Sequence, residues 1–427
     1  MKNPFFLFVA ALFINGLTSA QIRPYDKRGL NVFESPKVEP QKFDGIKLKV
    51  GGSFTQSWQS LRHSNTAAPK IVSGFDQNKL IGIKPGFNTA NANLYLDVQL
   101  EDGIYLNLTT YLSSRHHNET WVKGGYIQFD KLTFLNSGFL DRVMKYTVIK
   151  LGHMEINYGD THFRRSDNGN SIYNPFVENY IMDSFTTEIG AEIDVYRNGF
   201  LGVVSVTNGE IKGDIGEYAP VPDASDGKRH AALIGKLGYD KQLTKKVRLR
   251  VTSSVYYTAG SSSNTLYGGD RAGSHYFGVI ENALATSAAF SGRFNPGFTD
   301  KITSLMGNIF LKVGGFEFFT TLESSKGRNR TETSERKASQ FASDLVYRFG
   351  KRENFWFGTR YNTVKSDMIE LVDVKLDRIA LSGGCFVTKN IMTKVEYVNQ
   401  NYDDFVSTDI RNGGKFSGLV IEAVVGF

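Results

Sequence analysis

The chain has 427 residues, with 50 Lys and Arg against 43 Asp and Glu, a formal net charge of +7 and one cysteine. Only 41% of its residues are hydrophobic, and beyond the N-terminus no stretch approaches the roughly 20 consecutive apolar residues that a membrane-spanning helix needs. These values exclude a helical membrane bundle and a disulfide framework, and the dispersed positive charge does not indicate a nucleic-acid partner. The 43 glycines and 13% aromatic residues instead indicate many short strands and turns.

The first twenty residues have the pattern of a secretory signal peptide. Lys2 gives a positive start, residues 5–17 are nearly all apolar, and small residues end the segment at Ala20. This order is typical of a signal that is cleaved after export, here before Gln21. We therefore predict a signal peptide at 1–20.

From residue 46 to residue 427, hydrophobic and polar residues alternate with period two. Near the C-terminus, Leu419, Ile421 and Phe427 share one parity, and Val420 and Glu422 share the other. In a strand the two parities point to opposite faces. The alternating segments often reach ten residues, one face carries full charges, and aromatic residues bracket many segments, as expected of strands that cross a membrane. We therefore predict an all-β fold, a transmembrane antiparallel β-barrel.

About sixteen strands are predicted, at 46–60, 89–101, 103–114, 120–130, 146–158, 187–196, 200–208, 231–242, 247–260, 300–313, 316–326, 336–349, 354–367, 375–388, 391–403 and 414–427. Short turns alternate with longer polar loops, and in outer-membrane barrels the short turns face the periplasm. A short helix is expected at 138–144, inside an unusually long turn. In the next strand, Lys150 shares the parity of the apolar Met154 and Ile156, so we expect a bulge or a lysine that reaches toward the periplasmic surface.

Several short motifs recur in one known family. They are the segments at 29–34, 49–54 and 394–397, with Tyr402-Asp403-Asp404 and the closing Gly426-Phe427. Together they resemble the Bacteroidetes-type branch of the phosphate-selective porin O/P family, over most of the mature chain. The resemblance implies a sixteen-stranded porin, often a homotrimer, in the bacterial outer membrane, with basic lumen residues that pass phosphate. The lumen parity here is of mixed sign, which departs from that pattern.

The loop from 159 to 186 combines charged residues with large apolar ones. A loop that projects into water would not carry so many apolar side chains, so we predict that it folds into the barrel. Near the resulting constriction we place Arg164, Arg165 and Asp167, and as plug residues we place Tyr173, Phe176, Tyr180 and Met182. The alternative is a loop packed on the outer rim or on a partner protein.

Five further arginines have lumen parity in their strands: Arg248, Arg250, Arg348, Arg360 and Arg378. They could offer steps to anionic solutes along the lumen wall. The competing interpretation is that they form ion pairs with carboxylates of neighbouring strands and simply fill the lumen.

The sequence predicts three domains: the signal peptide 1–20, a periplasmic N-terminal segment 21–45 that either reaches a partner or lies in the lumen, and a barrel from 46 to 427. The leading functional hypothesis is a porin for passive diffusion of small hydrophilic solutes, anions among them. An occluded barrel that serves as a structural or accessory subunit of a larger outer-membrane assembly is the alternative, and a surface barrel whose loops bind a ligand is a third. No enzymatic activity, cofactor or metal is expected. Expected partners are outer-membrane lipid, lipopolysaccharide, further copies of the chain and other outer-membrane proteins.

Overall fold

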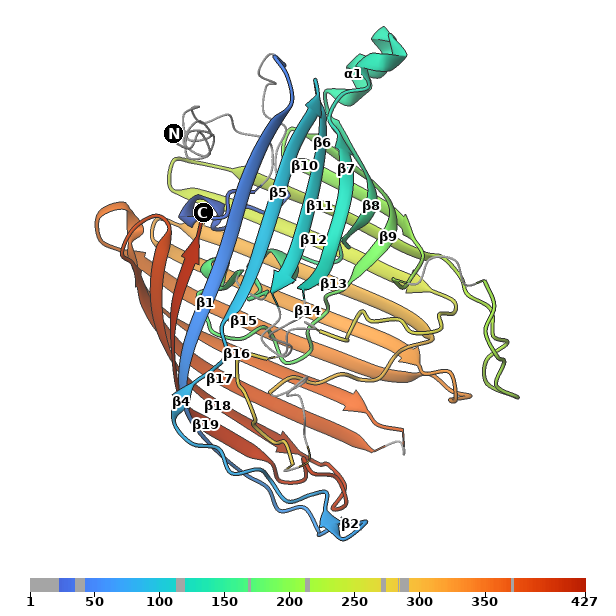
Figure 1. The fold of residues 1–427 in the computed structure, drawn as a ribbon, viewed down its shortest axis with the longest axis vertical. Coiled ribbons are helices and arrows are strands. Elements are labelled where there is room, and N and C mark those ends of the chain that lie inside the picture. The colour runs from blue at the N-terminus through green and yellow to red at the C-terminus, as the bar shows by residue number, and fades with distance from the viewer. Residues whose placement is uncertain are drawn as a thin grey trace, which may run out of the picture.

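In the computed structural model the chain forms a closed antiparallel β-barrel with sixteen wall strands (Figure 1). The structure describes residues 23–34, 43–112, 120–167, 170–211, 216–269, 274–282, 284, 292–369 and 372–427, so the predicted signal peptide lies outside the described residues. Wall strands pair in chain order. The ring closes because β1 (Lys47–Ser64) pairs with β5 (Asn91–Glu101) on one side and with β19 (Lys415–Gly426) on the other.

The other wall strands are β6 (Ile104–Leu112), β7 (Thr120–Phe129), β8 (Thr147–Glu155), β9 (Thr187–Arg197), β10 (Phe200–Thr207), β11 (Ala232–Gln242), β12 (Val247–Thr258), β13 (Lys301–Val313), β14 (Phe316–Arg328), β15 (Arg336–Phe349), β16 (Phe355–Asp367), β17 (Asp373–Phe386) and β18 (Ile391–Asp403). They match the predicted ranges to within a few residues, which confirms the fold class. The sequence did not predict the hairpin of β2 (Ile71–Val72) and β3 (Phe75–Asp76), nor β4 (Gly86–Phe87), which pairs with β1.

The α-helix α1 (Gly138–Met144) lies in the long turn between β7 and β8, as predicted, and its N-terminus is capped by Ser137, whose side chain accepts a hydrogen bond from Leu140 N. Short 3₁₀ helices are η3 (Lys27–Gly29), η4 (Thr133–Leu135), η5 (Thr161–Arg164), η6 (Asn170–Tyr173) and η7 (Lys351–Glu353). Within the described ranges, none of the helices has the length and apolar character needed to cross a membrane.

Apolar side chains cover the outside of the wall, and charged side chains point inward. In β19, Leu419 and Ile421 are 45% and 47% exposed, whereas Val420 and Glu422 are fully buried. Toward the periplasmic end, outward aromatic rings contact one another in a girdle made of Phe316, Tyr347, Phe349, Phe355 and Phe357. A closed sheet without edges, banded by apolar and aromatic residues, is what hydrocarbon requires of a spanning β-structure. The protein is thus built for the bacterial outer membrane.

The prediction for Lys150 in β8 is wrong. Its ammonium lies 2.7 Å from Glu192 and 3.0 Å from Asp194 of β9, inside the barrel. Met154, which shares its parity, is buried in the interior as well, and the register between β8 and β9 is continuous. The inward face of this strand is partly apolar because other segments of the chain cover it, and neither a bulge nor a lysine at the membrane surface is needed.

Three segments enter the barrel and fill most of its interior. They are the N-terminal residues 23–34, the loop 156–186 between β8 and β9, and the described part of the loop 259–300 between β12 and β13. Together with inward residues of the wall, the two loops form an apolar cluster that includes Tyr158, Val177, Ile181, Tyr267, Tyr276, Phe294 and Val398. The barrel therefore has a packed core over much of the cross-section where an open pore would hold water.

Candidate functional site

The loop 156–186 is fixed to the barrel wall by its own backbone. The amides of Val177, Ile181 and Met182 donate to side chains of three wall strands: to Glu396 of β18 at 2.8 Å, to Asn362 of β16 at 2.6 Å and to Gln340 of β15 at 2.9 Å. A buried segment without regular secondary structure must satisfy its peptide groups in this way. The inward fold that its composition predicts is therefore present.

The four predicted plug residues all lie in the interior. Tyr173, Phe176, Tyr180 and Met182 are each at most 6% exposed. The guanidinium of Arg360 lies 4.2 Å from the ring centre of Phe176 and 4.4 Å from that of Tyr180, within the range of a cation–π contact.

Three inward arginines of the wall are paired inside the barrel, with a wall carboxylate, with the loop or with both. Arg348 donates to Glu317 at 2.8 Å, and Arg360 donates to Asp344 at 2.6 Å and to the carbonyl of Glu178 at 2.7 Å. Arg378 donates to the carbonyl of Asn179 at 2.7 Å. The ion-pair interpretation thus describes their geometry, and a part in solute passage stays a prediction.

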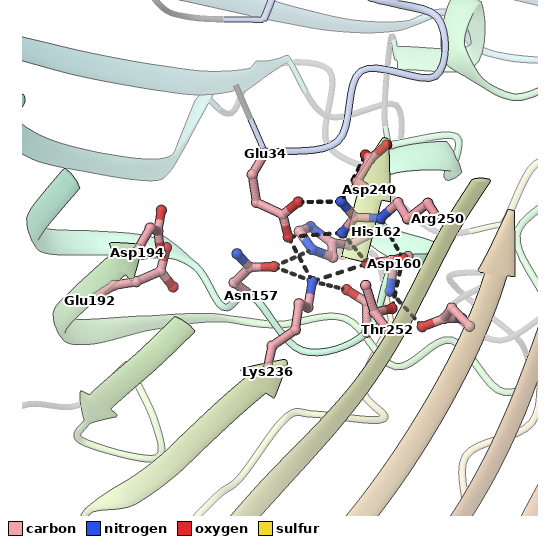
Figure 2. A network of polar contacts seen from close by, with 12 residues as sticks. Glu34, Asn157, Asp160, His162, Glu192, Asp194, Lys236, Asp240, Arg250 and Thr252 are labelled. Carbon is pink, nitrogen blue, oxygen red and sulfur yellow. Dashed lines mark hydrogen bonds and ion pairs between the residues drawn. The ribbon is translucent and has the colours of Figure 1, made fainter. Parts of the chain in front are cut away.

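The N-terminal segment lies in the lumen, the second of the two places that the sequence left open. It is locked there by a buried charge network (Figure 2). Glu34 lies 2.7 Å from Arg250 and 3.1 Å from Lys236, and both cations also contact Asp160 of the inward loop, at 2.7 and 3.1 Å. Burial opposes the ionisation of Glu34, but the two cations outweigh it and lower its pKa to about 2. Arg248 pairs with Asp240 at 2.7 Å on the neighbouring strand.

Two glycines of the wall leave room for the N-terminal segment. A Cβ at Gly51 would lie 2.3 Å from the ring of Tyr25, and one at Gly426 would lie within 2.0 Å of the Tyr25 carbonyl oxygen. Tyr25 stacks on Tyr95 with ring centres 3.9 Å apart and donates to Asp97 at 3.1 Å. The glycines of the opening and closing motifs therefore admit a specific inward segment.

The loop 259–300 is an inward segment that sequence reasoning missed. His275 lies 2.6 Å from Glu422, and Tyr276 donates to Glu396, so this loop contacts the same wall as the loop 156–186. Its apolar run from 276 to 280 carries the same signal that identified the first loop, a density of large apolar residues too high for a loop in water.

A cavity of about 220 Å³ lies in the interior against the wall formed by β5 to β9. The inward segments form its opposite side, through Arg23, Tyr25 and Glu34 of the N-terminal segment and through His162, Arg165 and Tyr173 of the loop. The wall side runs from Tyr196, near the periplasmic end, to Thr187, at the extracellular end of β9. The cavity thus follows the height of the wall away from the barrel centre.

Side chains of the wall and of the loop meet near the extracellular end of this cavity. Lys123 forms an ion pair with Asp167, and the ring of Phe185 lies between Lys123, 5.1 Å away, and Arg165, 3.7 Å away. Lys123 and Thr187 also line a second space of about 90 Å³, which Phe185 lines as well. Arg165 and Asp167 therefore line the cavity, and their place at a constriction stays a prediction; Lys123 and Phe185 were not among the predicted site residues.

Arg164 does not reach the cavity. Its guanidinium lies 5.0 Å from the ring centre of Phe319, binds Asn31 and is 3.8 Å from Glu317, on the opposite side of the loop. Arg164 ends the 3₁₀ helix η5, whereas Arg165 follows it with an extended backbone, and of the two only Arg165 lines the cavity.

Charges of both signs line the cavity. The cations are Arg23, Lys123, Lys150 and Arg165, and the carboxylates are Glu34, Glu155, Asp167, Glu192 and Asp194. Most of them neutralise one another, as the pairs of Lys150 with Glu192 and of Lys123 with Asp167 show. Across the part of the chain that the structure describes, no group of three or more potential metal ligands is found.

Comparisons with known proteins concern the fold alone. No family profile and no curated protein matches the sequence. Among solved structures, an anion-selective porin from Comamonas acidovorans is similar at a TM-score of 0.55 and 10% identity, over 90% of this chain and 100% of that one. The channel DcaP of Acinetobacter baumannii is similar at a TM-score of 0.51 and 12% identity, over 91% and 100% of the two chains. The trimer form of OmpT from Vibrio cholerae is similar at a TM-score of 0.51 and 8% identity, over 90% and 100%. The chain therefore has the barrel fold of outer-membrane porins.

Proposed function

We propose that this protein is an outer-membrane channel through which small hydrophilic solutes diffuse passively, along an off-centre passage between the β5–β9 wall and the inward segments. The observation that supports this proposal is the cavity of about 220 Å³ along that wall, which shares the lining residues Lys123 and Thr187 with a second space of about 90 Å³. Its lining of paired charges and tyrosines is wettable and offers hydrogen bonds, as a path for polar solutes must.

The size and charge of the passage suggest small solutes and weak charge selection. The cavity is smaller than the roughly 300–1,000 Å³ of sites for drug-sized ligands. Phosphate selectivity, which the resemblance to the porin O/P family implies, would need a continuous positive surface to replace the hydration of the anion. Here carboxylates such as Asp167 and Asp194 interrupt the cations, so phosphate selectivity stays a prediction from the resemblance alone.

A second candidate function is an occluded barrel that serves as a structural or accessory subunit of a larger outer-membrane assembly. The apolar cluster between the two loops and the β12–β19 wall favours it, because packing of this kind closes most of the cross-section. A homotrimer is compatible with either function, and a trimer form is named for one similar outer-membrane protein.

Conductance in planar bilayers tests the channel proposal. We expect wild-type protein to give small unitary current steps, and the substitution Phe185→Ala to enlarge them because it removes a large side chain that lines the second space beside the cavity. A matched control is Phe357→Ala, which removes the same side chain from the lipid face, where Phe357 is 58% exposed. The control should leave the step size unchanged.

Silence of both the wild type and Phe185→Ala would contradict the channel proposal. In that case a variant lacking residues 165–182 decides between the candidates, since currents that appear only after this deletion identify an occluded barrel. Circular dichroism of every variant checks that the barrel is still folded.

A further inference from the structure

The lipid face of the barrel carries a groove of about 560 Å³ across β12 to β16. Its outward floor residues are small, namely Ser253, Gly307, Ser324 and Ser339, while Leu322 and Phe341 stand at its sides. The volume lies within the range of roughly 300–1,000 Å³ that is typical of ligand sites. The wall therefore recedes here from the apolar surface that surrounds it.

Lysines gather at the extracellular end of this groove. Lys337 of β15 and Lys365 of β16 both point outward, and Lys365 lies directly opposite the floor residue Ser339. Lys326 lies opposite Lys337, although it is also 2.9 Å from Glu335. Like charges in such positions repel each other and lower the stability of the pair.

Two of these lysines lack an anionic partner within the described ranges. Lys326 shares Glu335 with Lys301, and Lys375 pairs with Asp377 at 2.5 Å. For Lys337 and Lys365 the described residues provide no carboxylate in contact with the ammonium, although the Asp367 carboxylate accepts the backbone amide of Lys337 at 3.1 Å. An anion from outside the chain would relieve the repulsion between the lysines and would neutralise the ammonium groups of Lys337 and Lys365.

We propose that this groove binds a phosphorylated, acylated glycolipid of the outer leaflet. An acyl chain lies over Gly307 and Ser324 between Leu322 and Phe341, and a phosphate of the sugar headgroup accepts from Lys337 and Lys365. The position of the lysines selects this lipid, because they lie at the ends of strands that face the long loops and hence the outer leaflet. Phospholipids of the periplasmic leaflet would place their phosphates at the other end of the wall.

Native mass spectrometry of the full chain in detergent, titrated with bis-phosphorylated lipid A, tests the proposal. The double substitution Lys337→Ala with Lys365→Ala should weaken binding about tenfold, since charge-assisted hydrogen bonds are lost. Gly307→Leu should weaken it as well, because no atom lies within 4 Å of a Cβ at this position and the new side chain fills the groove without a clash.

Matched controls separate the site from general effects. Lys351→Ala with Lys389→Ala removes two exposed lysines from the periplasmic turns, and Gly202→Leu adds the same side chain on the opposite wall, where a Cβ meets only Leu237 at 3.6 Å. Both controls should bind lipid A like the wild type.

Three results would overturn the proposal. They are equal binding by all variants, equal binding of lipid A that lacks both phosphates, and a change in subunit number on Gly307→Leu, which would make the groove a contact between copies of the chain. The conductance of the passage does not depend on this face, so failure here leaves the channel proposal standing.

Discussion

Glu34 is the residue on which docking of the N-terminal segment depends most. It is the only described anion of residues 23–34 that reaches the buried cations Lys236 and Arg250. Removing one partner of a buried ion pair costs about 3–5 kcal/mol, because the remaining charge is left without compensation. Glu34→Gln should therefore loosen the segment, and trypsin should cleave faster after Arg28. Asp102→Asn, at a carboxylate that is 34% exposed beside Lys131, should leave the cleavage rate unchanged.

The pKa of Glu34 gives this docking a pH dependence. Because the pKa of Glu34 in the folded chain is lowered to about 2, its contribution is present above the ordinary pKa of about 4.3 and is lost as the pH falls through 2. Hydrogen exchange of residues 27–34 should stay slow down to about pH 4 and accelerate toward pH 2. Slow exchange of these amides at pH 2 would contradict the assigned role.

Among the elements, the loop 259–300 should respond to pH in the opposite sense. Burial lowers the pKa of His275, but the adjacent Glu422 outweighs burial and leaves this pKa above its ordinary value. The stabilising pair is therefore fully present below about pH 6.5 and is lost as the pH rises through the raised pKa. Amides 274–282 should exchange faster at high pH, after correction for intrinsic rates, and His275→Gln should abolish the difference between low and high pH.

The elements also show how far a sequence can predict such a protein. The wall strands could be predicted from the period-two alternation of apolar and polar residues, because one face of every strand meets lipid. The helix α1 could be predicted from the unusual length of its turn. At Lys150 the alternation led to the wrong face. Met154 and Ile156 pack in the interior, so the inward parity of this strand is partly apolar and resembles a parity that faces lipid. The position of residues 23–34 inside the barrel depends on Gly51 and on the ion pairs of Glu34. These contacts join residues that are far apart in the chain. No local pattern encodes those contacts, nor the place of Lys123 and Phe185.

At the scale of the whole molecule, the strands of the barrel wall and the N-terminal segment inside the barrel are structurally separate. Residues 23–34, the described part of the N-terminal segment inside the barrel, make no strand pairing with the wall, and Arg23, Tyr25 and Glu34 line the cavity directly. A mature chain that starts at residue 43 should therefore keep its barrel, by circular dichroism, and give larger current steps than the full mature chain. Unchanged steps would mean that the passage does not run beside this segment.

The pairing of β1 with β19, called the seam here, closes the barrel by joining its first and last strands. It joins Ser53 to Gly426 and Ser64 to Lys415, whereas the other wall strands pair with near neighbours in the chain. Until β19 arrives, β1 and β18 expose unpaired edges that can recruit foreign strands. Both inward loops are synthesised before that moment, and the two halves of the seam flank Tyr25. Ring closure therefore removes both edges at once, and a chain that lacks its last dozen residues would keep an open sheet whose edges can pair with other chains.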